Sequence, residues 1–222
     1  MTSRPMVKSP LMQQLHYAVR PMERRDIPQV TELDREAFPG EWSFRSQTSY
    51  ERDLINPLIR HLVACTAVNE PESTEEAAQK SSWFKRLLNP SQQSDTPEKV
   101  LGFTGFWMML REAHITAIGV RDGYRRLGIG EALLIATIDL ASTLNADEVT
   151  LEVRASNEIA QALYRKYGFK PVGKRLRYYS SDGEDAVIMS TDRLSSVAFQ
   201  ATLRNLKKAH AERHGEILSR LQ

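Results

Sequence analysis

The chain has 222 residues, of which 41% are hydrophobic and 26% are charged, which is typical of a globular protein and excludes a largely disordered one. Its formal charge of +2 is too small to argue by itself for a nucleic-acid or membrane partner. No apolar run approaches the ~20 residues of a membrane-spanning helix, and the single cysteine, Cys65, excludes an internal disulfide. We therefore expect a soluble, cytoplasmic protein, somewhat longer than one typical domain.

The spacing of apolar residues predicts the elements before residue 70: strands over 16–22 and 61–68, and helices over 26–38 and 46–55. The first helix keeps its apolar positions mostly on one face, and Pro39-Gly40 ends it. Residues 1–15 form a leader that lacks the apolar segment of a secretion signal.

Residues 70–98 differ in composition from what surrounds them. They hold six acidic and three basic residues, are rich in Ser, Gln and Pro, and show almost no apolar periodicity. This pattern predicts an insertion in a surface loop, which a fold tolerates at little cost. Within it, residues 83–88 (WFKRLL) are amphipathic; we interpret them as a helical turn packed on the domain, with contact to a partner or a membrane as the alternative.

The second half alternates strands and helices: strands over 100–110, 114–120, 148–154, 170–179 and 185–191, and helices over 128–144 and 158–167. Alternation in the centre with hairpins beside it predicts an α/β (α+β) fold around a mixed sheet. Residues 193–222 are expected to form one further, C-terminal helix. The domain itself then spans residues 16–192.

The junction between the strand at 114–120 and the following helix carries a pattern suited to phosphate. Arg125 and Arg126 precede Gly128 and Gly130, which open the apolar helix. A helix N-terminus has unpaired N–H groups and partial positive charge, and glycine lets a phosphate approach the backbone. The alternative is that the glycines only shape a tight turn, since neither a Walker loop nor a complete dinucleotide fingerprint is present.

Two side chains suit proton transfer. Strand alternation places Glu152 on the face opposite Val149, Leu151 and Val153, where it could enter a cleft or be an ordinary solvated carboxylate. Tyr164, on the next helix, has a phenol with a pKa near ~10 that can donate a proton, or it packs against the domain. Asn157 directly precedes that helix and is a natural N-cap. The five histidines show no metal-ligand spacing, so no metal is expected.

Several motifs together resemble a known family. Arg125-x-x-Gly128-x-Gly130 after an apolar strand resembles motif A of the GNAT acetyltransferase superfamily. The later segments 151–157, 162–169, 177–179 and 184–189 follow at fitting distances and are similar to the RimI-type branch. The resemblance is strong over 114–191 and weaker over 16–68, where residues 36–39 (EAFP) resemble the end of the family's first helix. It does not extend to the leader, the insertion or the tail.

The resemblance implies a GNAT fold with a mostly antiparallel sheet of about six or seven strands, and acetyl-CoA as co-substrate. It implies coenzyme contacts by Ile118, Gly119, Val120, Arg125, Arg126, Leu127, Gly128, Ile129, Gly130, Glu131 and Asn157. It assigns Glu152 as general base and Tyr164 as general acid, in direct attack within a ternary complex.

For the acceptor, the resemblance implies a protein N-terminus, notably the N-terminal alanine of a ribosomal small-subunit protein, bound by Phe38, Tyr178 and Tyr179. Adjacent strand residues point to opposite faces, so only one of the two tyrosines is expected to meet the substrate. At pH 7 an α-amine is about 10–17% unprotonated and a lysine only ~0.04%, which also favours the N-terminus.

Two alternatives are kept. One is a GNAT enzyme for lysine side chains or a small-molecule amine. The other is a ribosome-associated binding module with a vestigial coenzyme site, because the tail carries basic residues: Arg204, Lys207, Lys208, Arg213 and Arg220. That tail could contact RNA, or it could be a helix packed on the domain with its basic face in solvent. We favour the packed helix.

Overall fold

The computed structural model describes residues 17–39, 45–66 and 98–219. The leader, residues 70–97 of the insertion and its amphipathic segment lie outside these ranges. The strands are β1 (Tyr17–Pro21), β2 (Ile59–Thr66), β3 (Val100–Met109), β4 (Glu112–Val120), β5 (Glu148–Arg154), β6 (Phe169–Tyr179), β7 (Glu184–Thr191) and β8 (Leu218–Ser219). The α-helices are α1 (Ile27–Ala37), α2 (Gln47–Ile55), α4 (Ile129–Thr143), α5 (Glu158–Lys166) and α6 (Val197–His214).

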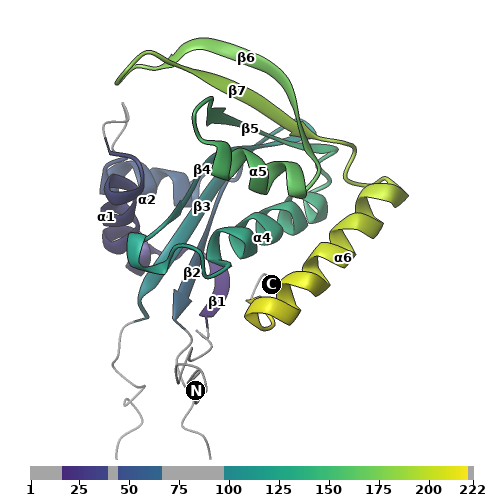
Figure 1. Cartoon of the computed structure of the whole chain (residues 1–222). Helices are drawn as coiled ribbons and strands as arrows, with labels where there is room; N and C mark the ends of the chain where they lie inside the picture. The colour runs from purple at the N-terminus through teal and green to yellow at the C-terminus, as the bar shows by residue number, and fades with distance from the viewer. Residues whose placement is uncertain (1–16, 40–44, 67–97, 220–222) are drawn as a thin grey trace, which may run out of the picture.

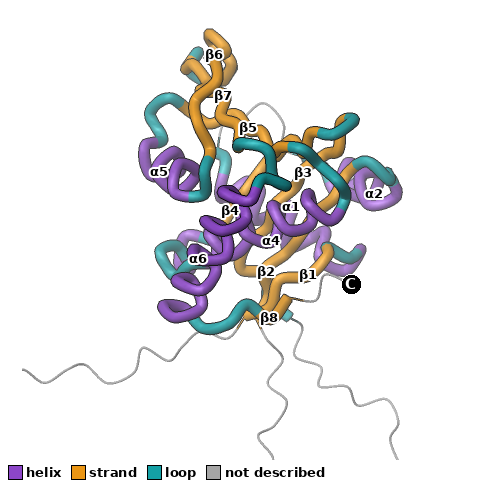
Figure 2. The backbone as a smooth tube through the Cα atoms, turned by 90° about the vertical axis from the view of Figure 1, so that its right-hand side faces the viewer, coloured by secondary structure: helices purple, strands orange, loops and turns teal. Residues whose placement is uncertain are grey.

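One sheet organises the molecule, with strand order β6-β7-β5-β4-β3-β2-β1-β8. All neighbours are antiparallel except β4 with β5 and β1 with β8, which confirms the expected mixed, mostly antiparallel sheet. Helices α1 and α2 lie on one side of it and α4, α5 and α6 on the other (Figure 1). The β6–β7 hairpin projects from the end of the sheet (Figure 2).

Helix α4 lies at the centre of the core. Nine of its residues are buried, among them Leu133, Leu134 and Ile138, so the helix is apolar well beyond a single stripe. A helix with this pattern must be covered on more than one side. The sheet covers one side, and α6 covers another through Phe199 and Leu203, which belong to the same apolar cluster as Leu134.

The C-terminal segment differs from the expected single helix over 193–222. Ser196 caps α6, its hydroxyl accepting from the Phe199 N–H at 3.2 Å, and the helix ends at Gly215, whose φ of +85° breaks the helical path. The chain then returns as the short strand β8, which pairs with β1 in parallel. The sheet therefore has eight strands instead of six or seven, because this added strand covers the edge of β1.

Two of the tail's basic side chains contact carboxylates of α4. Lys207 forms an ion pair with Asp139 of α4, and Arg213 lies 3.3 Å from the carboxylate of Glu131. These pairs fit a helix packed on the domain.

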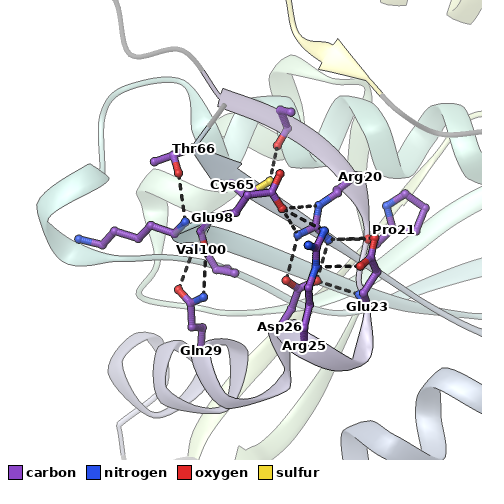
Figure 3. Close-up of polar contacts among 12 residues, drawn as sticks. Arg20, Pro21, Glu23, Arg25, Asp26, Gln29, Cys65, Thr66, Glu98 and Val100 are labelled. Carbon is purple, nitrogen blue, oxygen red and sulfur yellow. Dashed lines mark hydrogen bonds and ion pairs between the residues drawn. The ribbon is translucent and has the colours of Figure 1, made fainter. Parts of the chain in front are cut away.

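A buried ion cluster links β1 and the residues just before α1 to the end of the insertion (Figure 3). The Arg20 guanidinium donates to both carboxylate oxygens of Asp26, at 2.7 and 2.9 Å, and to Glu98 at 2.6 Å. Hydrogen bonding to Asp26 raises the pKa of Arg20, so its charge is permanent. The Gln29 amide bridges the Glu98 carbonyl and the Val100 N–H. Glu98, expected at the end of the insertion, is thus held in the folded domain.

Candidate active site

The parallel strands β4 and β5 pair only over part of their length. Pairing runs from Glu112 opposite Glu148 to Ile115 opposite Leu151, and beyond this point the strands separate. A bulge in β4 lies at the same place, because Ile115 and Ala117 face successive residues of β3. Such bulges bend a strand and re-aim its side chains. In the described part of the chain, the edge of β4 that carries Ile118-Gly119-Val120 therefore lacks a strand partner on the β5 side.

The separated strands border a cleft of about 840 Å³. Its walls come from the end of α1, from β4 and β5, from the start of α5 and from the β6–β7 hairpin. The cleft brings together these residues singled out from the sequence: Phe38, Ile118, Glu152, Asn157, Tyr164, Tyr178 and Tyr179. The residues from Gly119 to Glu131 do not line it.

Glu152 is held in the cleft by hydrogen bonds from an imidazole and a guanidinium. Its Oε2 accepts from Nε2 of His114 at 2.8 Å, and its Oε1 accepts from Nε of Arg175 at 2.9 Å. Burial raises the pKa of Glu152, but the hydrogen bonds and charges of His114 and Arg175 outweigh it, so the net shift is downward. Glu152 is therefore an oriented carboxylate at neutral pH, and not the solvated strand residue of the alternative interpretation.

His114 is a site residue that sequence reasoning missed, since it was considered only as a metal ligand. It lies on β4 opposite Thr150, two residues before Glu152 on the neighbouring strand. Its hydrogen bond to Glu152 is the main cause that raises the pKa of His114, and its Nδ1 lies 3.5 Å from Glu112. The two side chains come together only because β4 pairs with β5, so no pattern of neighbouring residues in the sequence predicts this contact.

We expect His114→Gln to move the acidic limb of the kcat/KM–pH profile to higher pH. The imidazole favours the ionised form of Glu152, so its removal raises the pKa of that carboxyl and delays its ionisation as pH increases. The profile is measured by initial rates with a peptide acceptor. An unchanged acidic limb would show that Glu152 does not control it.

Tyr164 and Asn157 reach the cleft from α5. Burial raises the pKa of Tyr164 to about 12, so its phenol keeps its proton at neutral pH. Its ring centroid lies 5.7 Å from that of Phe169. The Asn157 side-chain oxygen accepts from the Ala160 N–H at 3.1 Å, which confirms the predicted N-cap.

Tyr178 and Tyr179 both line the cleft, although strand alternation predicted that only one would. Their rings meet edge to face at 5.2 Å. The pairing of β6 with β7 shifts register between Arg175 and Tyr179, and Arg177 adopts a left-handed φ of +50°. This irregularity breaks the two-residue alternation. The Arg154 guanidinium lies 4.0 Å from the Tyr179 ring centroid and adds a cation–π contact.

The predicted phosphate cradle is a left-handed turn into α4. Arg126 and Gly128 have φ values of +67° and +82°, and Gly128 is the N-cap. A Cβ on Gly128 would approach the His214 ring to 2.7 Å, so the fold itself requires this glycine. Gly130 has no such requirement: its Cβ would meet only Val120, at an ordinary 3.5 Å. The tight-turn interpretation thus explains Gly128 but leaves Gly130 unexplained.

Other cradle residues take different positions from those expected of ligand-binding side chains. The Glu131 carboxylate points to Lys166, Tyr167 and Arg213, so only its backbone N–H remains for a coenzyme. The Ile129 side chain is buried in the core, so this residue too could contact a coenzyme only through its backbone N–H. Arg125 is exposed and bonds to Asp122 at 2.7 Å.

Three further observations concern chemistry outside the cleft. Cys65 is buried in β2, and burial raises the pKa of its thiol. Within the described ranges, no three His, Cys, Asp or Glu side chains lie together as metal ligands. No helix among those residues is long and apolar enough to cross a membrane.

The chain is similar to known acetyltransferases. Residues 27–169 match the model of the acetyltransferase (GNAT) family. A Bacillus subtilis protein assigned as a ribosomal protein bS18-alanine N-acetyltransferase is 31% identical over 172 residues, 78% of this chain and 93% of the relative. An N-alpha-acetyltransferase of Sulfurisphaera tokodaii is 51% identical over 83 residues, 37% of this chain and 49% of the relative.

Among solved structures, the ribosomal-protein-S18-alanine N-acetyltransferase from Escherichia coli superposes with a TM-score of 0.60 at 26% identity, over 82% of this chain and 96% of that one. The family match spans more than half of the chain, and the Bacillus relative is similar over almost its whole length. The chain is therefore a member of the GNAT acetyltransferase family and an acetyl-transferring enzyme.

Proposed function

We propose that this enzyme transfers the acetyl group of acetyl-CoA to the α-amine of a protein N-terminus, with the N-terminal alanine of a ribosomal small-subunit protein as the favoured acceptor. The observation that carries the proposal is the cleft where β4 leaves β5, because it joins an oriented carboxylate, a protonated phenol and two aromatic rings. The names of its relatives, ribosomal protein bS18-alanine N-acetyltransferase and N-alpha-acetyltransferase, support the acceptor.

The chain offers a fitting place for acetyl-CoA. The free edge of Ile118-Gly119-Val120 can pair with an extended amide-containing arm, as an added strand would. The turn at Arg125–Gly128 and the N–H groups of the first turn of α4 suit the diphosphate. Asn157, which caps α5, lines the cleft. When bound, acetyl-CoA supplies the acetyl group as an activated thioester.

Two residues would move the protons. Glu152 would accept the proton of the substrate ammonium, directly or through water, and Tyr164 would donate its phenolic proton to the departing sulfur. Moving a proton from an α-ammonium to an ordinary glutamate carboxylate costs about 5 kcal/mol, and moving it from a lysine ammonium costs about 8 kcal/mol. Because His114 and Arg175 lower the pKa of Glu152 further, an acceptor with a low amine pKa suits this site best.

The acceptor's first residues would lie between α1 and the β6–β7 hairpin. Phe38 lines the cleft from the end of α1, and Tyr178 and Tyr179 line it from β6. Arg154 holds the hairpin in place through ion pairs with Asp182 and Glu184, both at 2.8 Å.

We expect Gly130→Ala to leave the melting temperature unchanged or raise it while weakening CoA binding. Alanine is favoured over glycine in a helix by about 1 kcal/mol, and among the described residues no atom obstructs its methyl group. The same methyl group would stand where the diphosphate approaches the backbone. Thermal unfolding and calorimetric titration with CoA measure the two effects. Normal CoA binding by this variant would contradict the placement of the diphosphate.

The acceptor is tested by incubating the enzyme with acetyl-CoA and a panel of peptides, read by mass spectrometry. Peptides that begin with alanine should be acetylated at the N-terminus, whereas matched peptides with a blocked N-terminus and an internal lysine should not. Preferential modification of lysine, or of a polyamine, would instead support the alternative of another amine acceptor.

A further inference from the structure

The C-terminal helix α6 ends directly on the phosphate cradle. His210 is fully buried, and its Nε2 lies 3.1 Å from the Gly128 carbonyl oxygen. A carbonyl oxygen only accepts, so Nε2 carries the proton and donates it. The same oxygen accepts the first N–H bond of α4, from Ala132 at 2.9 Å. His210 therefore fixes the peptide group that begins the helix.

His214 lies one turn further along α6, against the same glycine. Its ring occupies the space that a Cβ on Gly128 would need, and its centroid is 5.0 Å from that of His210. The ring is half-buried, and among the described residues no group hydrogen-bonds to either of its nitrogens. A polar ring with unused N–H capacity thus rests on the N-cap of α4.

Arg213 adds a guanidinium beside it. Its Nε donates to the Ala209 carbonyl oxygen at 3.0 Å, and its Nη2 lies 3.3 Å from Glu131, which is also paired with Lys166. The side chain is 51% exposed. Arg125 and Arg126 belong to the loop that precedes the same N-cap, and Arg125 forms an ion pair with Asp122 at 2.7 Å.

The chemistry of α6 changes where it reaches the cradle. Phe199 and Leu203 bury apolar side chains in the core, whereas the last two turns carry the buried His210, the half-buried His214 and the exposed Arg213. A helix that served only as a cover would be expected to continue its apolar stripe, because burying an imidazole costs free energy. The switch therefore needs another reason, and α6 lies beyond the residues that match the family model.

We propose that the last turns of α6 form part of the coenzyme site. His214 and Arg213 bind phosphate oxygens of the coenzyme through charge-assisted hydrogen bonds, and His210 is a positioning residue that holds the Gly128 carbonyl. This inference rests on the proposed placement of the coenzyme diphosphate at the cradle. The bound phosphate is either the diphosphate or the 3′-phosphate of CoA, which share the same chemistry.

The test is calorimetric titration of the wild type, His214→Ala and Arg213→Gln with CoA, dephospho-CoA and pantetheine. We expect each variant to bind CoA on the order of tenfold more weakly and pantetheine unchanged. An equal loss with dephospho-CoA identifies the diphosphate, and no loss with it identifies the 3′-phosphate. Arg204→Gln, which removes an exposed charge elsewhere on α6, should bind all three as the wild type does.

His210 requires a readout that a merely structural role would not change. His210→Leu should raise the KM for acetyl-CoA while leaving kcat at saturation unchanged, and His210→Gln, which keeps a side-chain N–H, should restore part of the affinity. A fall in kcat with unchanged KM would contradict the positioning role. Melting temperatures are recorded for each variant to identify unfolding.

The outcomes separate this inference from the proposed function. If Gly130→Ala weakens CoA binding but His214→Ala and Arg213→Gln do not, the α6 site is wrong and the cradle stands. An equal loss with pantetheine would also overturn phosphate contact by α6. If the wild type does not bind CoA, the proposed function itself fails.

Discussion

Glu152→Gln should lower kcat for peptide acetylation by about 10²–10⁴-fold while leaving the Kd for CoA within about twofold. Glutamine keeps the size of the side chain and can still accept from His114 or Arg175, but it cannot take a proton from the ammonium. Whether the acceptor binds as the ammonium or as the free amine, the attacking nitrogen then has no positioned base for the proton that it must lose. Steady-state rates with an alanine-initiated peptide, together with CoA titration, measure both quantities.

A carboxylate on the same strand supplies the control. Glu148 shares a face of β5 with Glu152 four residues earlier and accepts from the Ser190 hydroxyl at 2.8 Å, but it does not line the cleft. Glu148→Gln should therefore keep a nearly normal kcat. Wild-type turnover by Glu152→Gln would remove Glu152 from the role of base. A similar loss in both variants would point to damage to β5.

Arg20→Leu should lower the free energy of unfolding by about 3–5 kcal/mol. The Asp26 side chain is only 3% exposed and Glu98 is 13% exposed, so removing the guanidinium leaves two carboxylates buried without their shared cation. The desolvation cost of each is then uncompensated. Chemical denaturation at pH 7, followed by circular dichroism, measures the change.

Arg25→Gln is the matched control, because Arg25 is 64% exposed and reaches the same Glu98 from the surface at 3.3 Å. Solvent screens that pair, so the loss should be about 1 kcal/mol or less. Substituting Arg20 and Asp26 together with apolar residues should recover part of the stability. A loss of less than about 1 kcal/mol for Arg20→Leu would mean that the cluster opens to water.

Local sequence patterns are enough to select several of the candidate site residues. The strand–arginine–glycine–helix order gave the cradle, and two-residue alternation placed Glu152 on the polar face of β5, which its half-buried position confirms. Asn157 is a cap because an amide before an apolar helix satisfies its free N–H groups. Each feature depends on residues within a few positions of one another.

Patterns of the same kind were wrong where the chain is irregular. Alternation failed at Tyr178 and Tyr179 because the bulged strand no longer repeats every two residues. The tail was expected to be helical over 193–222, but the helix ends at Gly215 and residues 218–219 pair with β1 as a strand. Glu98 was assigned to an acidic insertion, yet its carboxylate neutralises Arg20, 78 residues earlier in the chain.

The sequence alone determined the mixed α/β class, the order of its elements, the GNAT resemblance and the two proton-transfer candidates, because periodicity, caps and motifs are short-range. Only the tertiary structure decided that His114 and Arg175 hold Glu152, that the cleft opens where β4 leaves β5, and that α6 meets the cradle. These contacts join residues far apart in the chain, and their formation depends on how whole elements pack.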